Sequence, residues 1–196
     1  SLNEAKIVII PCCTDYKKFN NINQSKIEKI KSKYLNNSDI FIITYIGSLG
    51  GVYLLNEMLD FFKTFRLKNK NAIFQILTNQ KSIANNILIK SYSELQNYVC
   101  IKSVQKSQIP FFLSISNYTL SFINPTYARQ ASCPTKLSES FAAGIPVITN
   151  HNYGDISEII KKYNCGLLIE NFDNDNYERI SNTIIHNNIF KKNIIQ

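Results

Sequence analysis

Long apolar runs are missing from this sequence. A transmembrane helix needs about 18 or more apolar residues in a row, whereas the longest run here, KIVIIPCC at residues 6–13, has only the length of a strand. No basic, apolar and small-residue signal peptide opens the chain. Met58 is the only methionine, so Ser1 is not a natural start. We therefore expect a piece of a longer protein with a processed or engineered N-terminus.

Cysteine is scarce and follows no pattern of a metal site or a disulfide framework. Cys12 and Cys13 are adjacent, while Cys100, Cys133 and Cys165 stand alone. An odd number without paired spacing argues against structural zinc and disulfides, and fits a reducing cytosol. We expect most of these cysteines to be buried as small hydrophobic side chains.

Basic residues outnumber acidic ones, but they form no concentrated patch in the sequence. The formal net charge is +8, and the lysines are scattered mostly among Asn, Ile and Ser. No basic segment with interleaved aromatic residues supports nucleic-acid binding. Attraction to an anionic ligand or an anionic membrane surface stays open. A hydrophobic content of 44% identifies a globular chain rather than a disordered one.

Strand-like and helix-like patterns alternate along the whole chain. Short connections between them predict a doubly wound, mostly parallel α/β sheet with helices on both faces. We expect Asp155 to be the N-cap of a helix. The expected strands are 5–11, 40–46, 71–79, 97–104, 118–124, 145–150 and 165–170; the expected helices are 25–35, 52–65, 82–92, 134–143, 155–163 and 174–188, with a short helix or turn at 107–116.

A glycine-rich turn is the first candidate site. Gly47, Gly50 and Gly51 follow a predicted buried strand and precede a predicted helix. Glycine lets a backbone approach phosphate closely, and a helix N-terminus offers unpaired N–H groups. Gly47 and Ser48 are therefore candidates for contact with a phosphate or a sugar. The pattern is not the dinucleotide-binding fingerprint, and a plain tight turn is the alternative interpretation.

The segment SCPTKLSESFAAGIPVITN, residues 132–150, contains the second candidate site. Pro134 suits the first position of a helix, and Ser132 or Cys133 suits the N-cap. Backbone amides from Thr135 onward would then be available to an anion.

Charged side chains flank this helix start. Lys136 is a cation where the helix dipole disfavours one, which is tolerable if an anion is bound there. Arg129 lies just upstream, so Arg129, Lys136 and the amides together can hold a diphosphate. Glu139 lies one turn after Lys136, and a carboxylate suits the two hydroxyls of a ribose because it only accepts hydrogen bonds. A surface ion pair between Lys136 and Glu139 is the alternative interpretation.

Four segments carry a resemblance to a known family. They are IVIIPCCTDYKKF (7–19), YIGSLGGVYLLNEMLDFF (45–62), ASCPTKLSESFAAGIPVIT (131–149) and CGLLIE (165–170). The sequence resembles the C-terminal, donor-binding half of GT-B-fold glycosyltransferases, of the retaining family 4 type found in bacterial surface-polysaccharide synthesis. The resemblance covers essentially the whole chain, and its most specific part is 131–149.

The resemblance implies a division of the chain and an activity. Residues 1–24 would be the interdomain strand and hinge, and residues 25–196 the nucleotide-sugar donor-binding domain. The N-terminal acceptor domain would be absent from this chain. The implied reaction transfers a sugar, with retention, from a nucleotide-diphosphate sugar to a glycan or lipid-linked acceptor. The isolated fragment would bind nucleotide and show little or no transfer.

The resemblance also implies what the site contains. The donor is expected to be UDP-linked, and the nucleotide base to contact residues around 102–104. No cofactor and no metal are expected. The expected location is the cytoplasm, with peripheral association at the inner face of the membrane left open.

Two departures from the family pattern concern the donor site. The family places carboxylates at both ends of an E-x7-E block; Glu139 matches the second, the ribose contact, whereas the first falls at Ala131. Many relatives also carry an Arg and a Lys after the first strand, where this chain has only GSLGG. Arg129 and Lys136 are the candidates to supply that charge.

Other interpretations remain open from the sequence. A nucleotide-sugar epimerase would share the architecture, although only two histidines are available for proton transfer. A non-enzymatic flavodoxin-like binding domain would favour a phosphoacceptor Asp after a strand, where this chain has Pro11, Gly47 and Asn79. No catalytic residue is assigned.

Residues 151–155 and His186 are secondary candidates. The segment 153–155 matches a loop that relatives place beside the donor, so we expect it to contact substrate. We expect His151 to be an exposed loop residue and His186 to lie on the surface.

Overall fold

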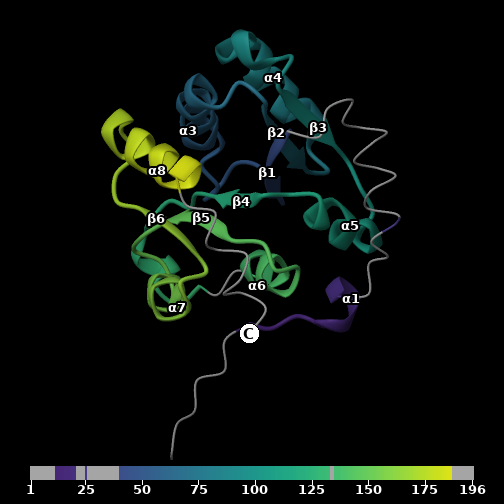
Figure 1. Cartoon of the computed structure of the whole chain (residues 1–196), viewed down its shortest axis with the longest axis vertical. Helices are drawn as coiled ribbons and strands as arrows, with labels where there is room; N and C mark the ends of the chain where they lie inside the picture. Colours follow the sequence, from purple (N-terminus) through teal and green to yellow (C-terminus); the bar gives the residue numbers. More distant parts are fainter. Residues whose placement is uncertain (1–11, 21–24, 26–39, 133–134, 187–196) are drawn as a thin grey trace, which may run out of the picture.

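The computed structural model describes residues 12–20, 25, 40–132 and 135–186. Within these residues the chain forms one six-stranded sheet in the order β3-β2-β1-β4-β5-β6. Every pairing in it is parallel, which confirms the doubly wound α/β prediction. Figure 1 shows the sheet running between two groups of helices.

The observed elements follow the predicted alternation, with shorter strands than the sequence pattern suggested. The predicted strand at 5–11 and helix at 25–35 lie outside the described residues, apart from Ser25. The strands are β1 (Phe41–Ile46), β2 (Ala72–Leu77), β3 (Val99–Lys102), β4 (Tyr118–Ser121), β5 (Val147–Asn150) and β6 (Gly166–Ile169). The helices are α1 (Lys17–Asn20), α3 (Leu55–Lys68), α4 (Lys81–Ser91), α5 (Ile109–Ser114), α6 (Thr135–Ala142), α7 (Ile156–Tyr163) and α8 (Asn174–His186), with 3-10 turns η1 (Ser93–Leu95), η2 (Lys106–Gln108) and η3 (Tyr127–Arg129).

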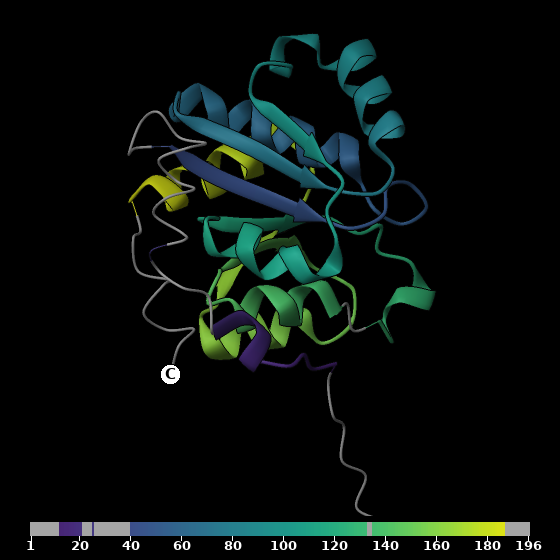
Figure 2. The ribbon, with the colours of Figure 1, turned by 90° about the vertical axis from the view of Figure 1, so that its right-hand side faces the viewer.

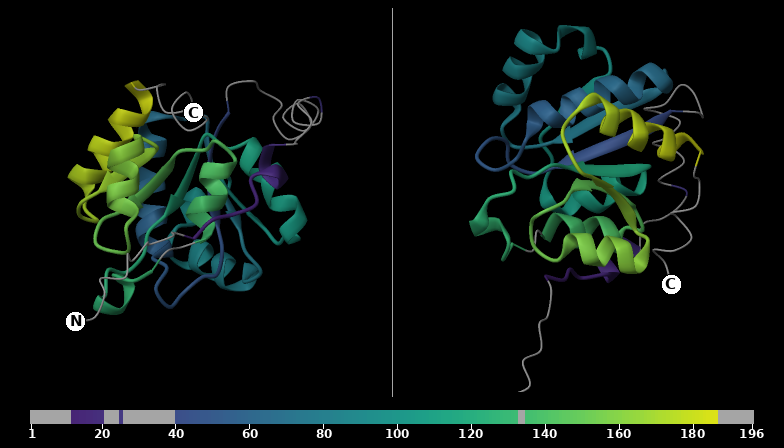
Figure 3. Two further views of the ribbon diagram at one scale, coloured as in Figure 1. Left: turned by 90° about the horizontal axis from the view of Figure 1, so that it is seen from below. Right: turned by 90° about the vertical axis from the view of Figure 1, so that its left-hand side faces the viewer.

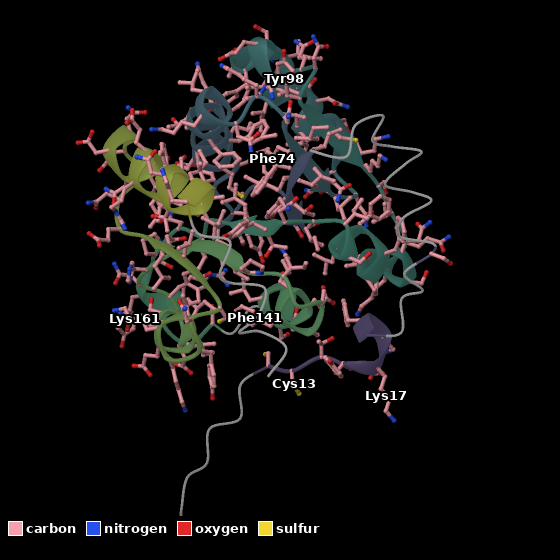
Figure 4. The ribbon with its side chains drawn as sticks, in the orientation of Figure 1. Cys13, Lys17, Phe74, Tyr98, Phe141 and Lys161 are labelled. Carbon is pink, nitrogen blue, oxygen red and sulfur yellow. The ribbon has the colours of Figure 1, made fainter. Side chains whose placement is uncertain are left out.

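The larger core lies between the sheet and α3, α4 and α8. Side chains of α3 such as Phe61 and Phe62 are fully buried against Phe74 of β2 and Phe122 after β4. Figure 4 shows Phe74 in this interior, whereas Lys17 and Lys161 point outward. Because so much aromatic surface is removed from water here, this face supplies most of the hydrophobic stabilisation of the sheet.

The opposite face of the sheet is covered by α5, α6 and α7 (Figures 2 and 3). Leu137 of α6 and Ile156 and Ile160 of α7 form a second apolar cluster with Val147. The short helix α1 contacts α5 and α6. This placement brings the N-terminal segment against the helices on this face of the sheet.

The strand order creates a switch point between β1 and β4. The helix that follows β1, α3, covers one face, whereas α6, which follows β4, covers the other (Figure 2). In doubly wound sheets, ligands bind in the crevice outside the carboxyl ends of the strands at such a point. The glycine turn after β1 and the start of α6 are the two segments that meet there.

The structure corrects the prediction for the cysteines and refines the one for Asp155. Of the cysteines it describes, only Cys165 is buried; Cys12 and Cys13 are exposed, and Cys100 is intermediate. Most cysteines are therefore not core residues, because Cys12 and Cys13 precede the sheet instead of lying within it. Asp155 does occupy the N-cap of α7, but its side chain makes no capping hydrogen bond.

Candidate functional site

The glycine turn and the start of α6 come into direct contact at the switch point. Gly47 has a φ of +140°, and a Cβ at this position would overlap the end of the Lys136 side chain. Glycine alone adopts this backbone conformation without strain and also leaves room for the end of the Lys136 side chain. The structure thus brings together two residues that the sequence analysis assigned to separate candidate sites.

The ammonium group of Lys136 is buried and has no hydrogen-bond partner in the described part of the chain. Its Nζ lies 3.6 Å from the centre of the Tyr53 ring and 5.5 Å from that of Tyr45. A buried cation without an acceptor is unfavourable unless a partner arrives. An anion could provide the acceptor that this ammonium lacks.

Two side-chain hydrogen bonds fix the glycine turn. The Tyr45 hydroxyl donates to the Ser48 carbonyl, and the Leu49 N–H donates to Gln80 Oε1 at 2.5 Å. The Gly47 N–H donates to the Leu77 carbonyl at 2.9 Å. Because these contacts hold the turn from β1 and from the end of β2, its backbone is in place before any ligand binds.

A cavity of about 270 Å³ opens beside this turn at the carboxyl ends of β1, β2 and β3. Gly47, Ser48 and Gln80 line one side of it, and Val104 and Ile109 line another. Val104 belongs to the segment that the family resemblance implied for base contact. The cavity is thus a candidate place for part of a nucleotide.

A second cavity, of about 520 Å³, adjoins the first at Ile109 and contains Glu139. Asp15 and Lys18 of the N-terminal segment and Lys106 of η2 also line it. Burial raises the pKa of the Glu139 carboxyl, and the positive charges of Lys106 and Lys136 act in the opposite direction. A half-buried carboxylate lining a cavity is well placed to accept hydrogen bonds from ligand hydroxyls.

Lys136 and Glu139 do not form an ion pair among the salt bridges of the described residues. Lys136 instead lies against Gly47 and Tyr53, whereas Glu139 lines the second cavity. The surface ion-pair alternative is therefore wrong. The two charges lie in different parts of the crevice.

The side chains of the other predicted site residues form no hydrogen bond or ion pair with the glycine turn or Lys136 in the described part of the chain. Ser132 is half-buried and Thr135 is exposed at the first position of α6, while Cys133 and Pro134 lie outside the described residues. Arg129 ends η3, and its carbonyl accepts hydrogen bonds from the N–H groups of Ser132 and Gly154, each at 3.0 Å. No interaction of its guanidinium with Lys136 or the glycine turn occurs among the described contacts, so its role stays a prediction.

The segment after β5 differs from its prediction. Tyr153 is only 1% exposed, and its hydroxyl is hydrogen-bonded to Thr149 Oγ1, so its side chain belongs to the core. A substrate contact by the Tyr153 side chain is therefore wrong, whereas contacts by Gly154 and Asp155 stay a prediction. His151 is half-buried instead of exposed; burial lowers its pKa, as does the nearby charge of Lys161. His186 is exposed, as predicted.

Tyr45, Tyr53 and Gln80 were missed by the sequence analysis. Tyr45 and Tyr53 looked like core residues of a strand and a helix start, and Gln80 looked like an ordinary polar residue after a strand. Nothing in the local pattern shows that Tyr53 faces Lys136, because the two residues meet only when α6 packs beside the turn after β1. The only hint in the sequence is that both tyrosines lie within a few residues of the glycine turn.

Other features of the described residues bear on the class of protein. Among them, no group of three or more His, Cys, Asp or Glu side chains could hold a metal ion. None of the helices in the described segments has both the length and the hydrophobicity to cross a bilayer.

Comparison with known proteins places this architecture in a family. The family model described as glycosyl transferases group 1 matches residues 26–196. No curated protein matches the sequence significantly.

Solved structures of glycosyltransferases share the fold at low sequence identity. WaaG, a glycosyltransferase involved in lipopolysaccharide biosynthesis, has a TM-score of 0.73 at 15% identity, over 94% of this chain and 49% of that one. Anabaena Alr3699/HepE, in complex with UDP-glucose, has a TM-score of 0.72 at 15% identity, over 93% and 48%. The C-terminal domain of the group 1 family protein LpcC from Francisella tularensis has a TM-score of 0.68 at 13% identity, over 93% of both chains. The chain therefore spans about half the length of the first two and nearly all of an isolated C-terminal domain.

Proposed function

Because this chain belongs to the glycosyl transferases group 1 family, we propose that it is the donor-binding half of a retaining, family 4-like bacterial glycosyltransferase. The N-terminal acceptor domain would precede it in a longer protein, with residues 1–24 as the interdomain strand and hinge. The match to an isolated C-terminal domain over 93% of both chains supports this division. The reaction transfers a sugar from a nucleotide-diphosphate sugar to a glycan or lipid-linked acceptor in surface polysaccharide synthesis.

The observation that carries this proposal is the buried, unpaired ammonium of Lys136 beside Gly47. A donor diphosphate would provide the acceptor oxygens that this group lacks, and its charge would offset the cost of burying a cation. The N-terminal amides of α6 lie on the same helix end and favour an anion. Gly47 and Ser48 would contact the diphosphate beside the Lys136 ammonium, and Arg129 and Ser132 lie on the segment leading into α6.

Departure of the diphosphate is the step that these groups assist. Negative charge develops on the leaving group as the bond to the sugar breaks, and a fixed cation stabilises it more in that state than in the bound donor. A lysine and backbone amides can supply this stabilisation, so we propose that the reaction needs no bound metal and no cofactor. Chelation of divalent ions should then leave nucleotide binding unchanged.

We propose that the nucleoside occupies the two adjoining cavities. The Glu139 carboxylate accepts hydrogen bonds from the ribose hydroxyls, and the base lies against Val104 on the far side of Ile109. UDP is the preferred nucleotide in this proposal, supported by the complex of the HepE relative with UDP-glucose. We propose a location in the cytoplasm, with peripheral association at the inner face of the membrane left open; the lack of a disulfide-framework spacing among the cysteines supports a reducing compartment.

Ligand-observed NMR on this chain tests the proposal. UDP, GDP, ADP and CMP are titrated separately against the wild type and the Lys136→Ala and Glu139→Ala variants. Lys90→Ala is the matched control, because Lys90 is an exposed lysine in the last turn of α4. We expect UDP to bind best, Lys136→Ala and Glu139→Ala each to weaken it about tenfold or more, and Lys90→Ala to bind like the wild type.

The same experiment can contradict the proposal. If Lys136→Ala and Lys90→Ala bind UDP equally well, the unpaired ammonium is not a diphosphate site. Chelator that abolishes UDP binding would refute the metal-independent site. Robust sugar transfer to an acceptor by this chain alone would show that it is not merely the donor half.

A further inference from the structure

The way in which Lys136 is held needs an explanation beyond its proposed contact with phosphate. Lysine has a long, flexible side chain, and in water it samples many rotamers. Here the ammonium lies 3.6 Å from the centre of the Tyr53 ring, without a hydrogen bond in the described part of the chain. Attraction between a cation and the face of an aromatic ring is strongest when both are shielded from water.

The Tyr53 ring is fixed by the backbone around it. The Tyr53 N–H donates to the Gly50 carbonyl at 3.2 Å, and Tyr53 forms a β-bridge with Ile123, which follows β4. The ring also packs edge-on against Tyr45 with centroids 6.1 Å apart. Tyr53 is thus anchored to the glycine turn after β1 and to the chain that leaves β4.

An aromatic face differs from a carboxylate as a partner for an ammonium group. A carboxylate would neutralise the charge and occupy its N–H donors, and would then compete with a phosphate. The ring holds the cation in place while its charge and its three N–H donors stay available. Such a contact prepares the cation for an incoming anion.

We propose that Tyr53 is a positioning residue for the donor diphosphate, whose ring holds the Lys136 ammonium beside Gly47 before and during binding. This inference rests on the proposed function of Lys136 as the diphosphate ligand. Tyr53 itself does not contact the diphosphate; it acts through Lys136. Without the ring, the Lys136 side chain samples other rotamers. Diphosphate binding then has to restrict it again, and this entropy cost weakens the affinity.

The test measures binding of UDP and of uridine to this chain by calorimetry or NMR. Tyr53→Leu removes the aromatic face, whereas Tyr53→Phe keeps it. Tyr98→Leu is the matched control: the Arg66 guanidinium lies 3.2 Å from the centre of the Tyr98 ring, so it loses a similar contact elsewhere. Figure 4 shows Tyr98 near the opposite end of the molecule from α6.

The expected result separates a positioning role from a general structural one. Tyr53→Leu should weaken UDP binding by about 5- to 30-fold, the range that a partly to fully desolvated cation–π contact spans. Uridine affinity should change less than about twofold, and Tyr53→Phe and Tyr98→Leu should bind UDP like the wild type. In a protein that already carries Lys136→Ala, adding Tyr53→Leu should cause no further loss of UDP affinity.

Four outcomes would overturn the proposal. They are unchanged or tighter UDP binding by Tyr53→Leu, an equal loss for UDP and uridine, a loss in Tyr53→Phe as large as in Tyr53→Leu, or a full additional loss on the Lys136→Ala background. If Lys136→Ala weakens UDP binding but Tyr53→Leu does not, the proposed function stands and only the role of Tyr53 fails. If the wild type binds no nucleoside diphosphate, both fail.

Discussion

The side chain of Lys136 fills the space that a Cβ on Gly47 would occupy. This contact joins the turn after β1 to the first turn of α6, and these segments lead to helices on opposite faces of the sheet. The absence of one methyl group at Gly47 therefore decides where the cation of the site lies. It also provides a way to displace that cation without removing it.

Gly47→Ala should abolish tight UDP binding while Lys136 remains in the chain. The new methyl group would collide with the end of the Lys136 side chain, and a φ of +140° is strained for alanine. We expect a loss of UDP affinity of at least about tenfold and a loss of unfolding free energy of about 1–3 kcal/mol. Calorimetric titration and urea unfolding measure the two effects.

Gly51→Ala is the matched control for this change. Gly51 has a φ of +64°, so alanine is strained there too, but nothing lies within 4 Å of the position its Cβ would take. Comparable destabilisation with retained UDP binding would separate displacement of Lys136 from backbone strain. Equal losses of UDP affinity in both variants would show that the contact between Gly47 and Lys136 is irrelevant to binding.

The affinity for UDP-glucose should fall as the pH is lowered from 7.5 to 5. The ribose hydroxyls need the ionised form of Glu139, and burial raises the pKa of this carboxyl above its usual value. Protonation, and with it the loss of affinity, therefore begins at a higher pH than for an exposed glutamate. UDP-glucose is the appropriate ligand because, unlike UDP, it has no terminal phosphate that titrates in this range.

Glu139→Gln is the control for that pH dependence. Glutamine does not titrate, so its weaker binding should be nearly constant over the same range, with circular dichroism confirming that both proteins stay folded. The neighbours of Glu139 in the second cavity include Asp15, Lys18 and Lys106. A wild-type-like pH profile in Glu139→Gln would assign the titration to a group other than Glu139.

Thr149→Val should destabilise the protein more than Tyr153→Phe. Thr149 Oγ1 donates to the Ser121 carbonyl at 2.7 Å and is also bonded to the Tyr153 hydroxyl. Valine removes the bond to the Ser121 carbonyl and leaves the buried Tyr153 hydroxyl without its Thr149 partner, at a cost of about 2–4 kcal/mol, whereas phenylalanine removes one partner cleanly and costs about 1 kcal/mol. Urea denaturation of the two variants measures the difference, and the reverse order would contradict the hydrogen-bond geometry.

Gly166→Ala should destabilise the sheet without touching the site. A Cβ at the start of β6 would overlap the backbone carbonyl of Val147, and backbone cannot move aside as a flexible side chain can. We expect a loss of about 2–4 kcal/mol in unfolding free energy, typical of overpacking at a rigid position. A thermal melt of this variant that matches the wild type would show that β5 and β6 can separate to accept the methyl group.

The sequence predicted the architecture well because each element carries its own signal. In the run at 40–46, residues that point to either face of the sheet are mostly apolar, as expected for a strand covered by helices on both faces. The structure agrees, because β1 is buried at its centre. The helix at 134–143 was recognised from its start signals, and α6 begins at Thr135. Strand ends were overestimated because residues such as Thr78 and Phe122 are buried beyond the last ladder pair.

The site was predicted only in part, for a reason that Tyr153 and Tyr53 illustrate. Tyr153 was expected at the substrate because of its place in the chain, yet its side chain turns into the core to meet Thr149. Tyr53 was overlooked, yet its ring holds the buried cation. The direction in which a side chain points depends on neighbours that are remote in the sequence.

What the sequence alone determined is the alternation of strands and helices, the glycine turn, and the charged start of the helix at 135. These are local properties, set by hydrophobic periodicity, turn residues and the spacing of Lys136 and Glu139. The tertiary structure alone decided that Lys136 lies against Gly47 and Tyr53 while Glu139 lines a different cavity. The reason is that parallel strands bring all their carboxyl ends to one edge, so the order of β1 and β4 in the sheet, which no local pattern encodes, sets which loops meet.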